Sequence, residues 1–445
     1  MRTRWAAWTG LLIAGCGLGS QSVNLNPPKV PDDVSVPAAA EGTPADMLPY
    51  FDDYSWQAFL ALVRPAAAGQ RGAADEHLTV TSDQKPKVFE TFKAMWEVLH
   101  GKPDGTLDAD HPVPAPWRQY DQGSFNACGV DPKFGDLVLA SFSGWSDLGQ
   151  GFFGALNGPL VAQNGTYVHY WTGYNEVEFE QIAKSKAYLP TSPGTTFPTG
   201  SLSVKASWMD MAHIAHSERY YTRNAWVRDP NDAIGHCEMK PMGLVGLHIA
   251  QKTHNRLQWI WSTFEQVDNV PDDPPDPLGS TGTYNFHRNG VAFMKPGNPY
   301  PAQPIGWPPP PPQNVNRVKH IHPLTQTTNL AYRKALQAAG SVWQNYQLVM
   351  TQFAIKPDQT GPDTATPDYT FPGTNNAGTA FANSSIETYE QGNIGDSCMA
   401  CHLDTNCEDF VCSIKIRTSA VPPVNMIHVM PVDSKLSKEP PKERK

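Results

Sequence analysis

The sequence predicts an α+β protein, with a central antiparallel β-sheet region flanked by N-terminal helices and a C-terminal helical segment. Apolar residues recur at helical spacing near both ends of the chain. Between residues 131 and 300, short β-type runs alternate with Gly, Pro and Asn. Charged residues reach only 17 %, and 42 Pro and 35 Gly interrupt the 445 residues, which disfavours a helical bundle.

The first 15 residues predict an export signal. Arg2 and Arg4 precede the apolar stretch Trp5–Ala14, which is too short to span a bilayer. This is the only long apolar run in the sequence, so a multi-span membrane protein is excluded. We expect the signal to be removed from an exported protein.

Cys16 follows this stretch directly. The run Leu12-Ile13-Ala14-Gly15-Cys16 resembles the lipobox of bacterial lipoproteins, which implies acylation of the Cys16 thiol and cleavage just before it. Gly17, where an Asp would indicate inner-membrane retention, favours the outer membrane of a Gram-negative bacterium. Residues 16–45 are polar and Pro-rich, and predict a flexible tether on the periplasmic side. An ordinary signal peptide with an incidental Cys is the alternative.

Helices and strands follow from residue 46. The spacing of Trp56, Phe59 and Leu60 predicts a helix over 46–63, and a second helical pattern covers 88–99, within an N-terminal helical region 46–130. The β-rich region 131–300 holds runs at 165–172, 201–209, 243–252 and 257–265, the last two joined as a hairpin by Thr253–Arg256.

The C-terminal third returns to helical spacing after a Pro-rich loop at 301–328. We expect a helix over 329–353 and another over 380–390, within a C-terminal helical segment 329–433. Residues 434–445 form a charged tail that predicts disorder.

Net charge and cysteine content narrow the class further. The net charge is −9, with no basic block before the last few residues, so nucleic acid is not an expected partner. Of seven cysteines, four remain after Cys16 and a C-terminal motif are set aside. An even remainder in an exported protein predicts two disulfides, with buried thiols as the alternative. Four cysteines allow three connectivities; a local Cys407–Cys412 pair would leave Cys128–Cys237 as a long-range pair.

The C-terminal motif is Cys398-Met399-Ala400-Cys401-His402. C-x-x-C-H is the signature of c-type haem attachment, because thiols one helical turn apart reach both vinyl groups of a porphyrin. With 7 Cys and 14 His, chance would produce it about 0.003 times per chain. We therefore expect one covalent haem c on Cys398 and Cys401, with His402 as the proximal iron ligand. A thioredoxin-like pair would need a βαβ context that is missing here, and no second ligand pair indicates zinc.

The distal side of such a haem decides between electron transfer and small-molecule chemistry. His248 is the leading candidate, because an imidazole within the apolar run from Gly243 is otherwise costly. Strand alternation predicts that Leu244, Gly246, His248 and Ala250 share one face. Other candidates are His213, His216, Met426, His428 and Met430.

The partner strand of this hairpin supplies further candidates. Trp259, Trp261, Thr263 and Glu265 would share a face and could wall the same space, with Glu265 as a proton-active group. The alternative is an ordinary β-sheet core that the tryptophans fill, with His248 hydrogen-bonded within it.

Several segments resemble a bacterial group of large monohaem cytochrome c family proteins. The matching segments are residues 54–60, 204–208, 246–249 with 252–269, 345–346 and 382–387, together with the haem motif. They extend over roughly residues 50–415. The resemblance implies haem binding and electron transfer, with no assigned substrate.

A weaker similarity is to small β-sheet cytochromes c, which include the c-prime-beta type and the lysine-crosslinked hydroxylamine oxidases. Phe197–Gly200 followed by Lys205 is similar to their strand entry and lysine, and residues 243–265 to their later hairpin. This implies that Lys205 matches the crosslinking lysine; a surface lysine on a strand is the alternative. The present chain is more than twice as long.

Two functions follow from these observations. The first is a lipid-anchored cytochrome that passes single electrons between periplasmic partner proteins. The second is a haem enzyme that acts on a small nitrogen oxide, hydroxylamine or peroxide at an open distal face; its large size favours this mildly, because electron transfer needs only about a hundred residues. A gas sensor is a third interpretation, and the sequence leaves enzymatic activity open.

Overall fold

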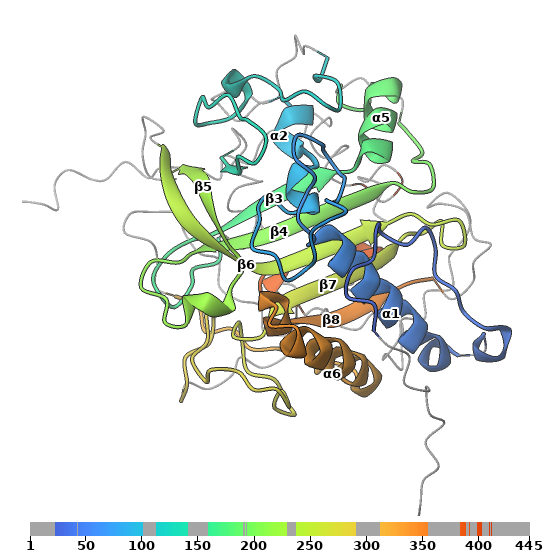
Figure 1. Cartoon of the computed structure of the whole chain (residues 1–445), viewed down its shortest axis with the longest axis vertical. Coiled ribbons are helices and arrows are strands. Elements are labelled where there is room, and N and C mark those ends of the chain that lie inside the picture. Colours follow the sequence, from blue (N-terminus) through green and yellow to red (C-terminus); the bar gives the residue numbers. More distant parts are fainter. Residues whose placement is uncertain are drawn as a thin grey trace, which may run out of the picture.

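The computed structural model shows one curled β-sheet with helices packed against it (Figure 1). The predicted α+β class is thus confirmed. The structure describes residues 23–41, 43–100, 113–140, 159–189, 192, 194–228, 237–290, 312–354, 383–388, 391, 398–402, 409 and 411.

The sheet has eight strands among the described residues. Their bounds are β1 (Lys93–Ala94), β2 (Val138–Leu139), β3 (Val168–Tyr174), β4 (Leu202–Asp210), β5 (Thr222–Arg228), β6 (Cys237–Gln251), β7 (Ile260–Gln266) and β8 (Tyr346–Gln352). The order β1-β3-β4-β6-β5-β2 is extended by β7, which pairs with β6, and by β8, which pairs with β7. All pairs are antiparallel except β2 with β5.

The long strand β6 organises this sheet. Its first half, up to Gly243, pairs with β5, and its second half lies between β4 and β7. The four strand runs predicted from the sequence correspond to β3, β4, the second half of β6, and β7. The predicted hairpin between β6 and β7 is confirmed as well.

The α-helices have the bounds α1 (Pro44–Leu62), α2 (Met95–Val98), α5 (Glu176–Ser185), α6 (Pro323–Ala338) and α7 (Cys398–His402). The short 3-10 helices are η1 (Ala38–Ala40), η2 (Val88–Thr91), η3 (Gly123–Phe125), η4 (Ser217–Arg219) and η5 (Val342–Asn345). The Thr43 side chain caps α1 by accepting from Asp46 N. Helices α1 and α6 lie against each other and against β8 (Figure 1).

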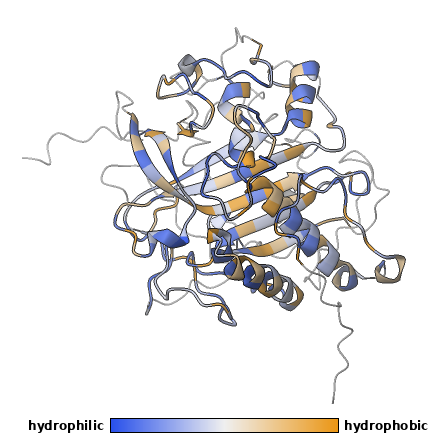
Figure 2. Cartoon of the chain, in the orientation of Figure 1, coloured by the Kyte–Doolittle hydropathy of each residue, from blue (hydrophilic) through white to orange (hydrophobic). Residues whose placement is uncertain are grey.

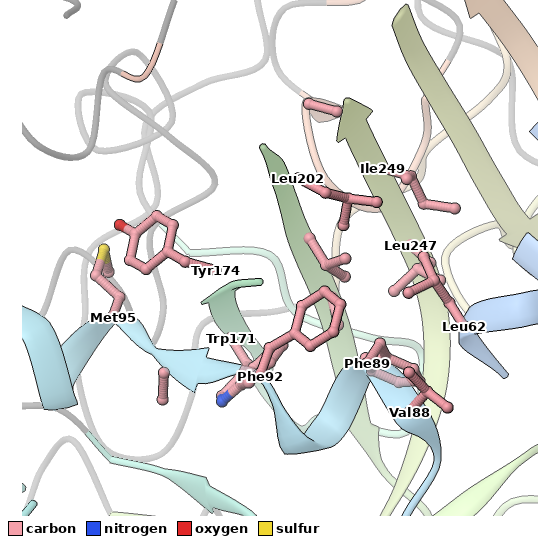
Figure 3. Packing of buried hydrophobic residues seen from close by; sticks show 14 of the residues in the cluster. Leu62, Val88, Phe89, Phe92, Met95, Trp171, Tyr174, Leu202, Leu247 and Ile249 are labelled. Atoms are coloured by element: carbon pink, nitrogen blue, oxygen red, sulfur yellow. The ribbon is translucent and has the colours of Figure 1, made fainter. Parts of the chain in front are cut away.

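The main core lies between this helical layer and the sheet. Figure 2 shows hydrophobic residues along α1 and the central strands. Trp56 of α1 stacks on Tyr332 of α6 and meets Phe264 of β7 edge-on. Figure 3 shows the continuation of the cluster, which includes Phe89 of η2 and Leu247 of β6. One face of the central strands is therefore committed to the core.

Two predicted helices differ in the structure. The expected helix over 329–353 begins earlier, at Pro323, within the residues predicted as a Pro-rich loop (301–328). It ends at Ala338, because Gly340 adopts φ +70° and the chain re-enters the sheet as β8. The pattern over 88–99 is η2, β1 and α2 in sequence, since Phe92 is extended and Ala94 pairs with Gly173 of β3. Both segments are buried on several sides, so apolar spacing could not separate helix from strand.

Residues 384–387 form bends, and Asn383 is irregular, so these residues do not form the predicted helix over 380–390. The remaining residues of that prediction, apart from Thr388, lie outside the described part. Hydrogen bonds from Ser384 to Glu265 of β7, and from Tyr170 of β3 to Ser385, attach this segment to the sheet.

The N-terminal strap, residues 23–41, lies against the body, although the sequence predicts a flexible tether there. Arg64 Nη1 donates to Pro27 O at 3.1 Å, and Gln251 Nε2 donates to Pro31 O at 3.0 Å. Within the described ranges, no helix is both long and apolar enough to cross a membrane.

The predicted long-range disulfide is confirmed. Cys128 and Cys237 are bonded; their Cα atoms are 5.4 Å apart, and the two residues are 109 positions apart in the sequence. The bond joins the loop after η3 to the start of β6. Cys16, Cys407 and Cys412 lie outside the described residues.

Candidate functional site

Three adjacent strands place Lys205, His248 and Thr263 side by side. Lys205 of β4 pairs with His248 of β6, which pairs in turn with Thr263 of β7. Directly opposite residues project from the same face of a sheet. We call this the polar face: it lies opposite the core and carries polar residues on neighbouring strands.

The alternation that predicted this face changes at one point. The register of β4 and β6 shifts between Ser207 and Trp208, so Ser207 pairs with Gly246 but Trp208 pairs with Leu244. Such a β-bulge reverses the alternation. The prediction that Leu244 shares a face with Gly246 and His248 is therefore wrong, and Leu244 belongs to the main core.

Residues 383–388, the C-terminal clamp, lie on the polar face. Ser384 Oγ donates to Glu265 Oε2 at 2.7 Å, and the Tyr170 hydroxyl donates to Ser385 O at 2.8 Å. Ser385 also lies so close to Gly246 that a Cβ there would be 2.2 Å from Ser385 Oγ. Glycine is therefore required at this position of β6 for the clamp to seat.

Asn383 of the clamp determines the hydrogen bonding of His248. The Asn383 Oδ1 accepts from the backbone N–H groups of Ser385 and Ile386, both at 2.8 Å. Its Nδ2 is thereby directed to Thr263 Oγ1 at 2.5 Å and to His248 Nε2 at 2.7 Å. Because an amide nitrogen only donates, His248 Nε2 accepts, and the proton of the neutral ring lies on Nδ1.

Charged groups surround His248 on this face. Glu387 Oε2 lies 3.2 Å from His248 Nε2, and their side chains are 28 % and 16 % exposed. Burial, and then the nearby charges of Lys205 and His402, hold the pKa of His248 well below its usual value. Burial also lowers the pKa of Lys205, against the opposing effect of Glu387, and its Nζ lies 5.4 Å from the Tyr170 ring centroid.

The C-x-x-C-H motif forms α7, a single helical turn on the same side of the sheet. The His402 ring lies 4.4 Å from the ring of Trp261 between centroids, and Met399 is fully buried. Trp261 pairs with Ala250 and thus projects from the polar face next to His248. The structure therefore brings Lys205, His248 and Trp261 together with His402.

The other two residues singled out on this hairpin have different surroundings. Glu265 is fully buried, and Arg317 Nη2 donates to its Oε2 at 3.0 Å in addition to the bonds from Ser384. These contacts make Glu265 an anchor for the clamp and engage both oxygens of its carboxylate. Trp259 precedes β7, is 1 % exposed, and lies between Phe197 and Trp261.

The remaining candidates do not join this face. His213 and His216 lie on an exposed turn after β4, and His216 Nδ1 is 3.4 Å from Glu218 Oε1. Met426, His428 and Met430 lie outside the described residues, as does the side chain of Cys401.

Sequence reasoning assigned no role to Asn383, Glu387 or Tyr170. Residues 382–387 entered only through a resemblance, and the polar alternation Ser203, Lys205, Ser207 on β4 was the signal that a second face is polar. Comparison with protein-family models, curated proteins and solved structures finds no match for this chain.

Proposed function

We propose that this chain is an exported, lipid-anchored c-type cytochrome that binds one haem through Cys398 and Cys401. Acylated Cys16 would hold it at the periplasmic side of the membrane. The observation that carries the proposal is the C-x-x-C-H turn seated on the polar face. Residues three apart on a helix lie on one side of it, so the thiols fit two attachment points on one porphyrin.

His402 would bind the iron as proximal ligand. Its side chain is half-buried, and its ring lies 4.4 Å from that of Trp261 between centroids. The donor set of two thiols and an imidazole fits a haem c. When bound, the haem supplies a one-electron iron couple, and electron transfer between periplasmic redox partner proteins is the function we propose.

A second function, chemistry on a small molecule, is favoured by the Asn383–His248 hydrogen bond. Because His248 Nε2 accepts from Asn383, its lone pair is engaged and not directed to a metal. His248 would then lie beside the haem without binding its iron. Lys205 and Glu387 would hold or pass protons beside a small ligand such as a nitrogen oxide, hydroxylamine or peroxide.

Haem attachment is tested on denaturing gels stained for haem peroxidase activity. We expect the stain to remain on the wild-type chain and to disappear from the Cys398→Ala/Cys401→Ala double variant. The Cys128→Ala/Cys237→Ala variant, which removes two cysteines away from the motif, is the control and should keep the stain. A stained motif variant would refute the proposal.

Absorption spectra with and without CO distinguish the two functions. The second function predicts a ferric spectrum without a sixth protein ligand, CO binding to the reduced form, and a His248→Ala variant with altered CO affinity but unchanged coordination. His213→Ala, on an exposed turn, is the control. A six-coordinate spectrum that becomes five-coordinate in His248→Ala would make His248 the sixth ligand. Electron transfer would then be the one function of the two that the spectra support.

A further inference from the structure

The polar face ends in a row of three residues, Ser201, Lys252 and Trp259. Lys252 N donates to Ser201 O at 2.9 Å, and Lys252 and Trp259 flank the last pair of the β6–β7 ladder, Gln251 with Ile260. Ser201 precedes β4 in phase with Lys205, and Lys252 follows β6 in phase with His248. The three residues therefore lie next to one another at one end of the sheet.

Two of the three hold a buried polar hydrogen for which the described part of the chain offers no acceptor. The Ser201 hydroxyl and the Trp259 indole N–H are both buried and unpaired there, with residue exposures of 0 % and 1 %. Buried donors are nearly always hydrogen-bonded in folded proteins, so two unpaired donors this close in the fold indicate a specific acceptor. Trp259 also adopts φ +68°, which is strained for a bulky side chain.

The third residue adds positive charge. Lys252 Nζ donates to Asp409 Oδ2 at 2.7 Å, and both side chains are almost fully buried. An ammonium group carries three donors, so Lys252 can bind a second carboxylate while it holds Asp409. A hydroxyl, an indole N–H and an ammonium together match the acceptor-only chemistry of a carboxylate.

The row lies next to the haem motif. The Trp259 ring is 6.4 Å from Trp261, and the Trp261 ring is 4.4 Å from His402. A haem carries two propionate carboxylates that must find donors wherever the porphyrin is buried. We propose that Ser201, Lys252 and Trp259 bind the propionate carboxylates of the haem. This inference rests on the proposed function.

The test is the midpoint potential of the haem as a function of pH. Hydrogen bonds favour the ionised propionate, so their removal raises the propionate pKa. We expect Trp259→Phe and Ser201→Ala each to move the pH-dependent step of the potential upward by about one pH unit. The iron absorption spectrum should not change. Ser201→Ala removes only a hydroxyl and keeps the test valid if Trp259→Phe does not fold.

Trp343→Phe is the matched control. The Trp343 indole N–H is also buried and unpaired in the described part, but its ring packs on Phe59 and Tyr221 in the core away from the polar face. It should leave the pH-dependent step in place. A haem-stained Ser201→Ala variant with the step unmoved would overturn this inference alone, as would the same result in a folded Trp259→Phe variant. A wild-type chain without covalent haem would overturn the proposed function itself.

Discussion

A carboxyl group buried beneath α1 makes the stability of this fold dependent on pH. Asp52 is completely buried, and its two oxygens accept from Thr325 Oγ1 and Thr351 Oγ1, both at 2.7 Å. Burial penalises the carboxylate more than the two hydroxyls stabilise it, which raises the pKa of Asp52 to about 7. The folded protein therefore holds a proton there that the unfolded chain releases.

The magnitude follows from the two pKa values. The ordinary pKa is 3.8 and the folded value is about 7, so the difference corresponds to about 4 kcal/mol at 1.36 kcal/mol per unit. A raised folded pKa means that the unfolded state binds fewer protons between these values. The contribution is complete below about pH 4, and it is lost as the pH rises through about 7.

Asp52→Asn removes this titration and keeps a neutral group of the same shape. We expect urea unfolding between pH 5 and 8 to give a free energy of unfolding that falls with pH in the wild type. In the variant this fall should be smaller by a few kcal/mol. Asp53→Asn, one residue along α1 and exposed, should keep the wild-type dependence. Parallel pH profiles for the wild type and Asp52→Asn would refute the reasoning.

Three further predictions concern the anchor and the clamp. Cys16→Ser should release the protein from membranes in fractionation, and persistent membrane association would reveal another anchor. Arg317→Met leaves the buried carboxylate of Glu265 without its cation, so the free energy of unfolding in denaturant should fall by about 3–5 kcal/mol. A fall of less than about 1 kcal/mol would contradict a buried ion pair. Gly246→Ala should lift the clamp, and faster proteolytic cleavage within residues 383–388 would show it; a cleavage rate equal to that of wild type would disprove the close contact.

The sequence predicted the secondary structure best where the apolar residues followed a single spacing. Trp56, Phe59 and Leu60 share a helical face, and α1 forms over nearly the predicted residues. Residues 346–352 also carry apolar spacing compatible with a helix, but pairing with β7 decides their state, and that partner is about eighty positions away. Local spacing contains no information about such a partner.

The candidate site was also predictable from the sequence only in part. His248 and Trp261 were identified because an imidazole and indoles stand out in apolar strands. Asn383 meets His248 across 135 positions, so no local pattern connects them. The β-bulge that moves Leu244 into the core depends on Ser207 and Trp208 of another strand.

The late position of the clamp in the sequence has a consequence for how the chain folds. Its bonds to Tyr170, Ser207 and His248 close loops of 215, 178 and 135 residues, and contacts of such long range form slowly. A chain that is synthesised from its N-terminus can form β3, β4, β6 and β7 long before residues 383–402 have been made. During that interval the polar face is open to solvent, and it closes only when the clamp arrives and forms these bonds.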